Sequence, residues 1–143
     1  PEKEFIFWAG FCPTHNALSP MHVAEAREAY PNALLAIHPE APPSVVELAD
    51  YVGSTKQIIN YCTESDRNEF IIGTEEGILH PLKKKNPNKI FHMLKYNFIC
   101  SNMKKTTMEV LYESLRDMKH VITLEEDILK KASLSLERML EGK

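Results

Sequence analysis

Short apolar runs alternate with helical stretches along most of this chain. Continuous apolar runs between turn-forming residues predict buried strands, and apolar residues recurring every three or four positions predict amphipathic helices. The predicted strands are residues 4–9, 33–37, 69–73 and 89–94. This alternation is typical of an α/β fold, so we predict a parallel four-stranded β/α sandwich followed by a C-terminal helical tail.

The predicted helices begin at recognisable capping residues. Ser19 followed by Pro20 is a favourable N-cap and first helical position. A capping box, Ser or Thr followed three residues later by Glu, occurs three times. Helices are predicted to begin near Ser19, Ser44, Ser54 or Thr55, Gly77, Thr106 and Thr123. The helix from Ser44 is expected to run through Val52, and the last two helices to bury wide apolar stripes against this domain or another one.

Composition limits the classes of function. The chain has 143 residues, enough for one domain with a real core, and its 43% apolar and 26% charged residues are ordinary for a soluble globular protein. A net charge of −3 argues against a dedicated nucleic-acid partner. No apolar run approaches the roughly 20 residues that span a bilayer, so we expect no membrane partner either.

Cysteine usage indicates the compartment. The chain has three cysteines, an odd number, and no signal peptide, which favours reduced thiols in a cytoplasmic setting. It begins at Pro1 and runs directly into a strand-like segment, which is typical of a portion of a longer protein.

Cys12 and Cys100 are the first candidate site residues. Each follows an apolar run and lies in a turn-forming segment, in Gly-Phe-Cys-Pro-Thr-His and Phe-Ile-Cys-Ser-Asn-Met. Thiolates gathered from separate loops suit zinc or an iron–sulfur cluster. The alternative is two buried free cysteines, because no compact Cys-x-x-Cys motif is present. Cys62 lies on the apolar side of a predicted helix, so we expect a core residue there.

Polar segments follow several predicted strands, where ligands of parallel sheets collect. His38-Pro39-Glu40 places an imidazole and a carboxylate at a fixed separation, which suits acid–base catalysis on a carbonyl or enol substrate. The alternative is a histidine bonded to a backbone carbonyl and a glutamate in a solvated turn.

Two further segments are candidates for substrate contacts. Gly53-Ser54-Thr55 precedes a helix, where N–H groups and hydroxyls favour a phosphate or carboxylate, although plain N-capping also explains them. His15, three residues after Cys12, is a candidate for donating a hydrogen bond near a metal cluster or for contacting substrate. The alternative is an exposed loop residue.

These segments, taken in order, resemble the quinolinate synthase family, the A protein of bacterial and archaeal NAD biosynthesis. The resemblance covers essentially the whole chain. Its motifs are Phe-Trp-Ala-Gly-Phe-Cys-Pro-Thr-His (7–15), Ile-His-Pro-Glu (37–40), Val-Glu-Leu-Ala-Asp-Tyr-Val-Gly-Ser-Thr (46–55), Phe-Ile-Ile-Gly-Thr-Glu (70–75), Gly-Ile-Leu-His (77–80) and Ile-Cys-Ser-Asn-Met-Lys-Lys-Thr-Thr (99–107).

The resemblance implies an activity and a cofactor. Family members condense iminoaspartate with dihydroxyacetone phosphate to quinolinate at a [4Fe-4S] cluster held by one cysteine from each of three α/β domains. By motif, Cys12 and Cys100 match two cluster ligands, and His38 and Glu40 match the active-site pair. The implied substrate-binding residues are Ser54, Thr55 and His15.

The resemblance also implies that the chain corresponds to the C-terminal half of the family protein. By this resemblance, residues 1–13 are the end of the family's second α/β domain, residues 14–100 form the third, and residues 101–143 form the helical tail. The half with the first cluster cysteine is then a required partner. A second hypothesis is an α/β module that binds anions but has lost the cluster and has no activity alone.

Overall fold

The computed structural model describes residues 4–141, which divide into two compact units between Lys104 and Lys105. The first unit contains the sheet and all the buried hydrophobic side chains, and the second contains two helices. Residues 1–3 and 142–143, which the predicted domain ranges include, lie outside the described residues. None of the described helices combines the length and apolarity that crossing a bilayer requires.

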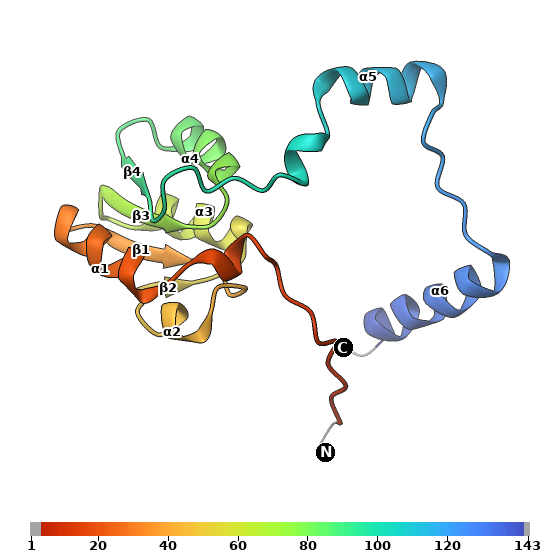
Figure 1. Cartoon of the computed structure of the whole chain (residues 1–143), viewed down its shortest axis with the longest axis horizontal. Helices are drawn as coiled ribbons and strands as arrows, with labels where there is room; N and C mark the ends of the chain where they lie inside the picture. The colour runs from red at the N-terminus through yellow and green to blue at the C-terminus, as the bar shows by residue number, and fades with distance from the viewer. Residues whose placement is uncertain (1–3, 142–143) are drawn as a thin grey trace. The chain divides into compact units, whose positions relative to one another are not determined.

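The first unit is built on a four-stranded parallel sheet, as predicted. Its strands are β1 (Leu34–Ile37), β2 (Tyr51–Val52), β3 (Glu69–Gly73) and β4 (Ile90–Met93). The spatial order is β2-β1-β3-β4, with every neighbouring pair parallel (Figure 1). The chain therefore leaves β1 toward one edge and β3 toward the other, which makes the carboxyl ends of β1 and β3 a topological switch point.

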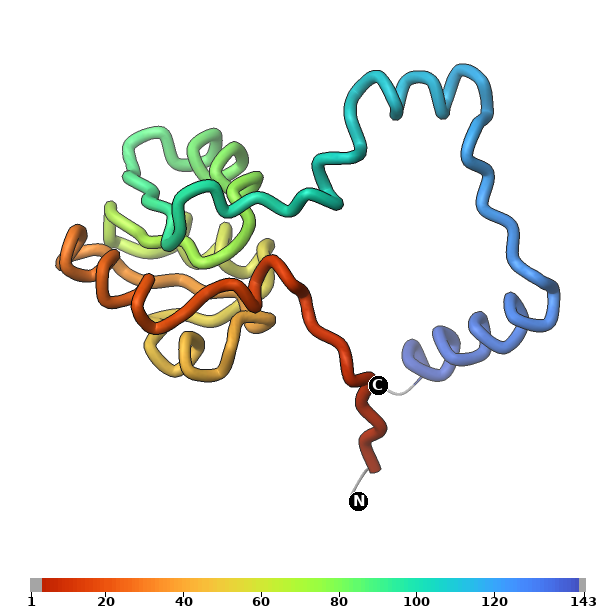
Figure 2. Tube along the Cα trace, in the orientation of Figure 1, coloured from red at the N-terminus to blue at the C-terminus, as the bar shows by residue number. Residues whose placement is uncertain are grey.

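One of the four predicted strands is wrong. Residues 4–9 form no strand but an extended segment that runs away from the sheet (Figures 1 and 2). Within the described residues this segment has no strand to pair with, and its side chains are exposed, Trp8 at 93%. High β-propensity alone does not make a strand, because ladder hydrogen bonds need a partner. The fourth strand is instead the short β2.

The helix predicted from Ser44 through Val52 is also wrong in extent. The observed helix α2 (Pro43–Val46) is capped by Pro42 and is one turn long. The chain then forms β2, where Tyr51 pairs with Ala36 of β1.

The other helices of the first unit are η1 (His15–Ala17), α1 (Pro20–Ala29), α3 (Thr55–Glu64), η2 (Glu76–Ile78) and α4 (Leu79–Lys85). The starts predicted near Ser19, Ser54 or Thr55, and Gly77 agree with α1, α3 and η2, whereas η1 was not predicted. Ser19 and Ser54 are the N-caps of α1 and α3, each in a capping box. The N-cap Ser54 and the first helical residue Thr55 of α3 are exposed. Farther along the same helix, Ile58 and Cys62 are fully buried, as predicted.

Helices cover both faces of the sheet. One apolar core joins the sheet to α1 and α2, and a second joins it to α3 and α4 (Figure 1). Successive residues of β3 alternate between these cores, with Ile71 in the first and Phe70 and Ile72 in the second, and all three are fully buried. A strand buried on both faces is why this run is continuously apolar.

The second unit contains α5 (Met108–Asp117) and α6 (Glu126–Glu141), preceded by η3 (Met103–Lys105) at the boundary. Two predicted capping boxes are wrong here. Thr107 rather than Thr106 caps α5, accepting from the Val110 N–H at 3.2 Å, and α6 begins three residues after Thr123.

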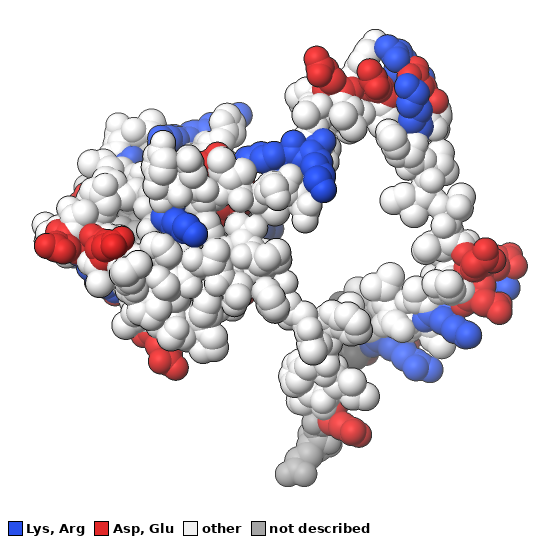
Figure 3. All heavy atoms as spheres, viewed as in Figure 1, with Lys and Arg blue, Asp and Glu red and all other residues white. Residues whose placement is uncertain are grey.

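The apolar stripes of α5 and α6 are exposed. Leu115, Met118, Leu136 and Met139 are each more than half accessible, and neither helix has a buried residue. Both helices also have acidic and basic side chains, including the acidic first turn of α6 (Figure 3). The predicted burial of these stripes therefore does not occur within the described residues.

Candidate functional site

The candidate site lies at the switch point of the sheet. His38 follows β1, Thr74 follows β3, and His15 enters between them from η1. Nδ1 of His15 lies 2.9 Å from a Glu40 carboxylate oxygen, and Nε2 lies 2.9 Å from the Thr74 hydroxyl. Since a carboxylate only accepts, Nδ1 of His15 donates to Glu40.

The two histidines form a stacked pair. The rings of His15 and His38 are 4.4 Å apart and tilted by 6°, and His15 is only 8% exposed. Burial lowers the pKa of His38, the nearby His15 lowers it further, and Glu40 partly opposes both. Nδ1 of His38 accepts the Glu40 N–H at 3.3 Å, so the neutral ring carries its proton on Nε2. An uncharged imidazole beside a carboxylate is suited to moving protons at neutral pH.

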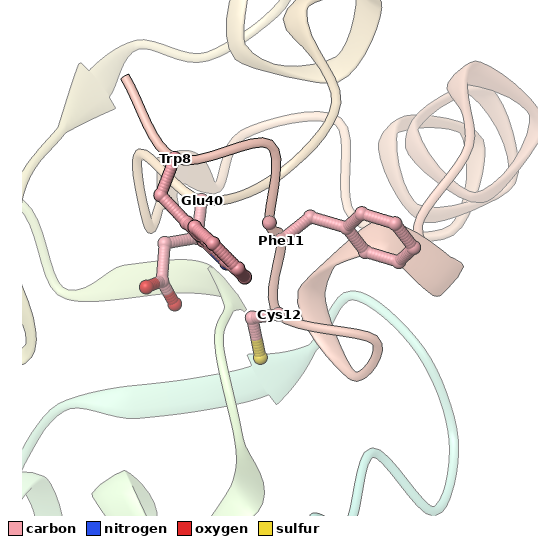
Figure 4. Close-up of a pocket in the computed structure, with 5 residues that line it drawn as sticks. Trp8, Phe11, Cys12 and Glu40 are labelled. Carbon is pink, nitrogen blue, oxygen red and sulfur yellow. The ribbon is translucent and has the colours of Figure 1, made fainter. Parts of the chain in front are cut away.

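Two hollows open near the cluster. The larger, about 520 Å³, is lined by Trp8, Gly10, Phe11, Cys12 and Glu40, and Figure 4 shows the labelled side chains around it. The smaller, about 320 Å³, is lined by His15, Thr55, Thr74, Glu75, Gly77, Ile78, Pro81 and Met103. Thr55, in the first turn of α3, thus faces the same hollow as His15.

The carboxylate of Glu75, which is buried and lines the smaller hollow, forms an ion pair with the exposed Lys104. Glu75 pairs with Lys104 at 3.0 Å and accepts the Gly77 N–H at 2.7 Å. Burial raises the pKa of Glu75, but Lys104 and the backbone N–H groups of Gly77 and Cys100 outweigh burial, so the pKa lies below its usual range. The hollow is therefore lined by a carboxylate that stays ionised.

The three cysteines differ in environment. Cys12 and Cys100 are half-buried free thiols, whereas Cys62 is fully buried. Hydrogen bonds from the Met103 backbone, then from the Thr14 side chain and the Asn102 backbone, hold the pKa of Cys100 below its ordinary value. Burial raises the pKa of Cys62 to about 12.

The structure brings most of the sequence-predicted site residues together. Cys12, His15, His38 and Glu40 lie in one cluster, and Thr55 lines the adjoining hollow. Ser54 lines neither hollow; its exposed hydroxyl accepts the Gln57 N–H at 3.4 Å as an N-cap. For His38 the alternative of a bond to a backbone carbonyl is not observed, since the ring accepts a backbone N–H. Glu40 does lie in an exposed turn, as its alternative expected, but it also bonds His15.

Four residues of this region were not among the predicted site residues: Thr14, Thr74, Glu75 and Lys104. Thr74 and Glu75 directly follow a buried strand, which is the signal that identified His38. Thr14 has no such signal, because its contact with Cys100 joins two loops that are distant in the sequence.

The fold and this cluster define an α/β protein with thiol, imidazole and carboxylate groups at the switch point of a parallel sheet. The sequence profile of the family described as "Quinolinate synthetase A protein" matches residues 1–141, so the chain belongs to this family.

Curated relatives agree with the family assignment. A quinolinate synthase of Alkaliphilus metalliredigens is 50% identical over 143 residues, which are 100% of this chain and 47% of the relative. One of Caldicellulosiruptor saccharolyticus is 52% identical over 141 residues, 99% of this chain and 46% of the relative. One of Clostridioides difficile is 47% identical over 145 residues, 99% of this chain and 48% of the relative. The chain spans about half the length of the curated relatives it matches.

Proposed function

We propose that this chain is the part of a cytoplasmic quinolinate synthase that supplies two cluster thiolates and the acid–base groups. The reaction condenses iminoaspartate with dihydroxyacetone phosphate and releases phosphate and two waters to give quinolinate. The observation that carries the proposal is the His15–Glu40–His38 cluster at the switch point, in a chain of this family.

The thiols suit a [4Fe-4S] cofactor. Cys12 and Cys100 are unpaired and half-buried, and the Cys100 sulfur accepts backbone and hydroxyl hydrogen bonds of the kind that tune cluster thiolates. Cys62 is enclosed in the apolar core and does not suit a ligand. The remaining half of a full-length relative would supply the third thiolate, leaving one iron open as a Lewis acid for substrate.

The neighbouring side chains have proposed roles in proton transfer and binding. His38 and Glu40 would exchange protons with the substrate during isomerisation and loss of water, because a neutral imidazole both accepts and donates near neutral pH. His15 and the hydroxyl of Thr55 would bind substrate in the adjoining hollow. For Ser54 we propose a contact with a substrate phosphate or carboxylate, since it lies at the N-terminus of α3.

A chimera tests this function. The chain would replace the matching region of the Alkaliphilus metalliredigens relative, and quinolinate would be measured after anaerobic reconstitution with iron and sulfide. We expect activity and the brown colour of sulfide-to-iron charge transfer. Cys12→Ser or Cys100→Ser should lose both the activity and the colour.

His38→Ala tests the acid–base role and should keep the cluster spectrum but lose turnover. A chimera that forms the cluster but makes no quinolinate contradicts the proposed function, and full turnover in His38→Ala contradicts the acid–base role.

A further inference from the structure

Three potential metal ligands converge next to the larger hollow, which Cys12 and Glu40 line. Ligand atoms from Cys12, His15 and Glu40 all lie within 4.8 Å of one another. Cys12 and His15 are three residues apart on the segment leading into η1, and Glu40 comes from the loop after β1. Metal–ligand bonds of about 2.0–2.3 Å put the ligands of a tetrahedral zinc site roughly 3.3–3.8 Å apart. Nδ1 of His15 and the Glu40 carboxylate, 2.9 Å apart, would separate slightly on binding, and the whole set needs only small side-chain shifts.

We propose that Cys12, His15 and Glu40 form a mononuclear site for a divalent transition metal such as Zn²⁺ when no cluster is bound. A thiolate, an imidazole and a carboxylate are a donor set that zinc accepts, and three protein ligands leave a fourth position open to water. Cys100 is not part of this site.

The contacts of His15 support the assignment. Its Nε2 faces the Thr74 hydroxyl at 2.9 Å, and Thr74 is 3% exposed. A metal on Nδ1 replaces the proton now shared with Glu40, and the neutral ring then carries its proton on Nε2, where it donates to Thr74. A buried partner of this kind fixes the tautomer and orientation of a histidine that binds metal.

The site is also accessible. The Glu40 side chain is 54% exposed, and it lines the larger hollow together with Cys12 (Figure 4). A metal ion can therefore enter without unfolding of the sheet.

This site competes with the cofactor of the proposed function. Cys12 belongs to both sets, so one sulfur cannot serve a mononuclear zinc and the cluster together. Bound zinc is therefore expected to slow cluster assembly. This consequence rests on the proposed function, whereas the zinc site itself does not.

Cobalt is the probe for the site in the 143-residue chain, under anaerobic conditions and with folding checked by circular dichroism. We expect one Co²⁺ per chain, with the visible bands of four-coordinate cobalt and a thiolate-to-cobalt charge-transfer band, displaced by Zn²⁺. Cys12→Ser should abolish the charge-transfer band, and His15→Gln or Glu40→Gln should weaken binding at least tenfold. Cys100→Ser and His38→Gln are the matched controls and should leave the spectrum unchanged. The proposal is overturned if Cys100→Ser loses the charge-transfer band as fully as Cys12→Ser, or if Cys12→Ser retains it.

A second measurement needs no variant. Zn²⁺ should protect Cys12 from alkylation by iodoacetamide, as measured by peptide mass spectrometry, while Cys100 continues to react. Protection of both cysteines, or of neither, contradicts the site. If zinc protects Cys12 in this chain but the chimera forms no cluster, the zinc site is upheld and the proposed function is contradicted. If the chimera forms the cluster but zinc gives no protection, the proposed function is upheld and the zinc site is contradicted.

Discussion

His15 joins the site through both of its ring nitrogens and through its ring face. Its two hydrogen bonds bind the loops after β1 and β3, and its stacking contact holds His38. A side chain with three such contacts has one orientation, which is the preorganisation that a catalytic or metal-binding site requires. His15 therefore positions its neighbours as well as offering its own chemistry.

The thiols of the native chain should differ in reactivity. At neutral pH we expect iodoacetamide to label Cys100 and Cys12 and to leave Cys62 unlabelled, because only a thiolate reacts and Cys62 is buried with a pKa raised to about 12. Peptide mass spectrometry in the absence of metal measures this. The control is the same reaction in urea, where all three should react. Labelling of Cys62 as fast as Cys100 in the folded chain contradicts the expectation.

His38 should make the metal-free chain less stable in acid. Its pKa is lowered in the folded state, whereas in the unfolded chain it has the ordinary value of about 6.5. As pH falls through that value, the unfolded chain takes up a proton that the folded chain resists, so the free energy of unfolding decreases. Urea denaturation at about pH 7.5 and about pH 5.5 measures the decrease, which should be smaller in His38→Gln. An equal decrease in both proteins argues against this effect.

Among the elements, the sheet edge that carries the site depends on close packing between β1 and β3. A Cβ on Gly73 would lie 2.8 Å from Cγ1 of the buried Ile37 and 3.2 Å from Cδ2 of Leu94. The Gly73 carbonyl also accepts the N–H of His38 at 3.1 Å. The C-terminal ends of β1 and β3 are therefore closely packed directly before His38 and Thr74.

Gly73→Ala should disturb both stability and the site. We expect a loss of about 1–3 kcal/mol in the free energy of unfolding, since the extra methyl overpacks a filled core. Urea denaturation measures the loss, and cobalt binding should weaken as the strand ends separate. Gly10→Ala is a control outside the core: its added Cβ meets only the exposed ring of Trp8. Equal stability of the two variants contradicts this role for Gly73.

Elements differ in how far the sequence determines them. Strands β1, β3 and β4 were predictable because each is an apolar run between turns, and His38 and Glu40 were predictable because they follow one. The two-residue β2 has no such run, and residues 4–9 have the run without a partner strand. The bonds of His15 to Glu40 and Thr74 depend on sheet order, which local patterns do not encode.

At the scale of the molecule, the core and the site belong to the first unit. All the buried hydrophobic side chains among residues 4–141 lie at or before Phe98, and the ion pair of Glu75 ends at Lys104. The exposed stripes of α5 and α6 contribute no core to the described structure.

A chain ending at Lys104 should therefore be about as stable as the full chain. We expect its thermal midpoint to change by less than about 4 °C, the smallest shift that about 1 kcal/mol produces in a domain of this size. Circular dichroism measures the midpoint. Truncation after Met93 is the matched control, because it also removes the buried Leu94 and Phe98 and should lower the midpoint strongly. A large decrease for the Lys104 truncation shows that α5 or α6 supports the fold.

The two bonds of His15 also order the events of folding. They close loops of 25 and 59 residues, and the longer one encloses α1, β1, α2, β2, α3 and β3. Closing such loops costs chain entropy that two hydrogen bonds do not offset, so pairing of β1 with β3 comes first. The histidine cluster is thus completed late in folding, and its imidazole NMR signals would report that the domain has reached its final state.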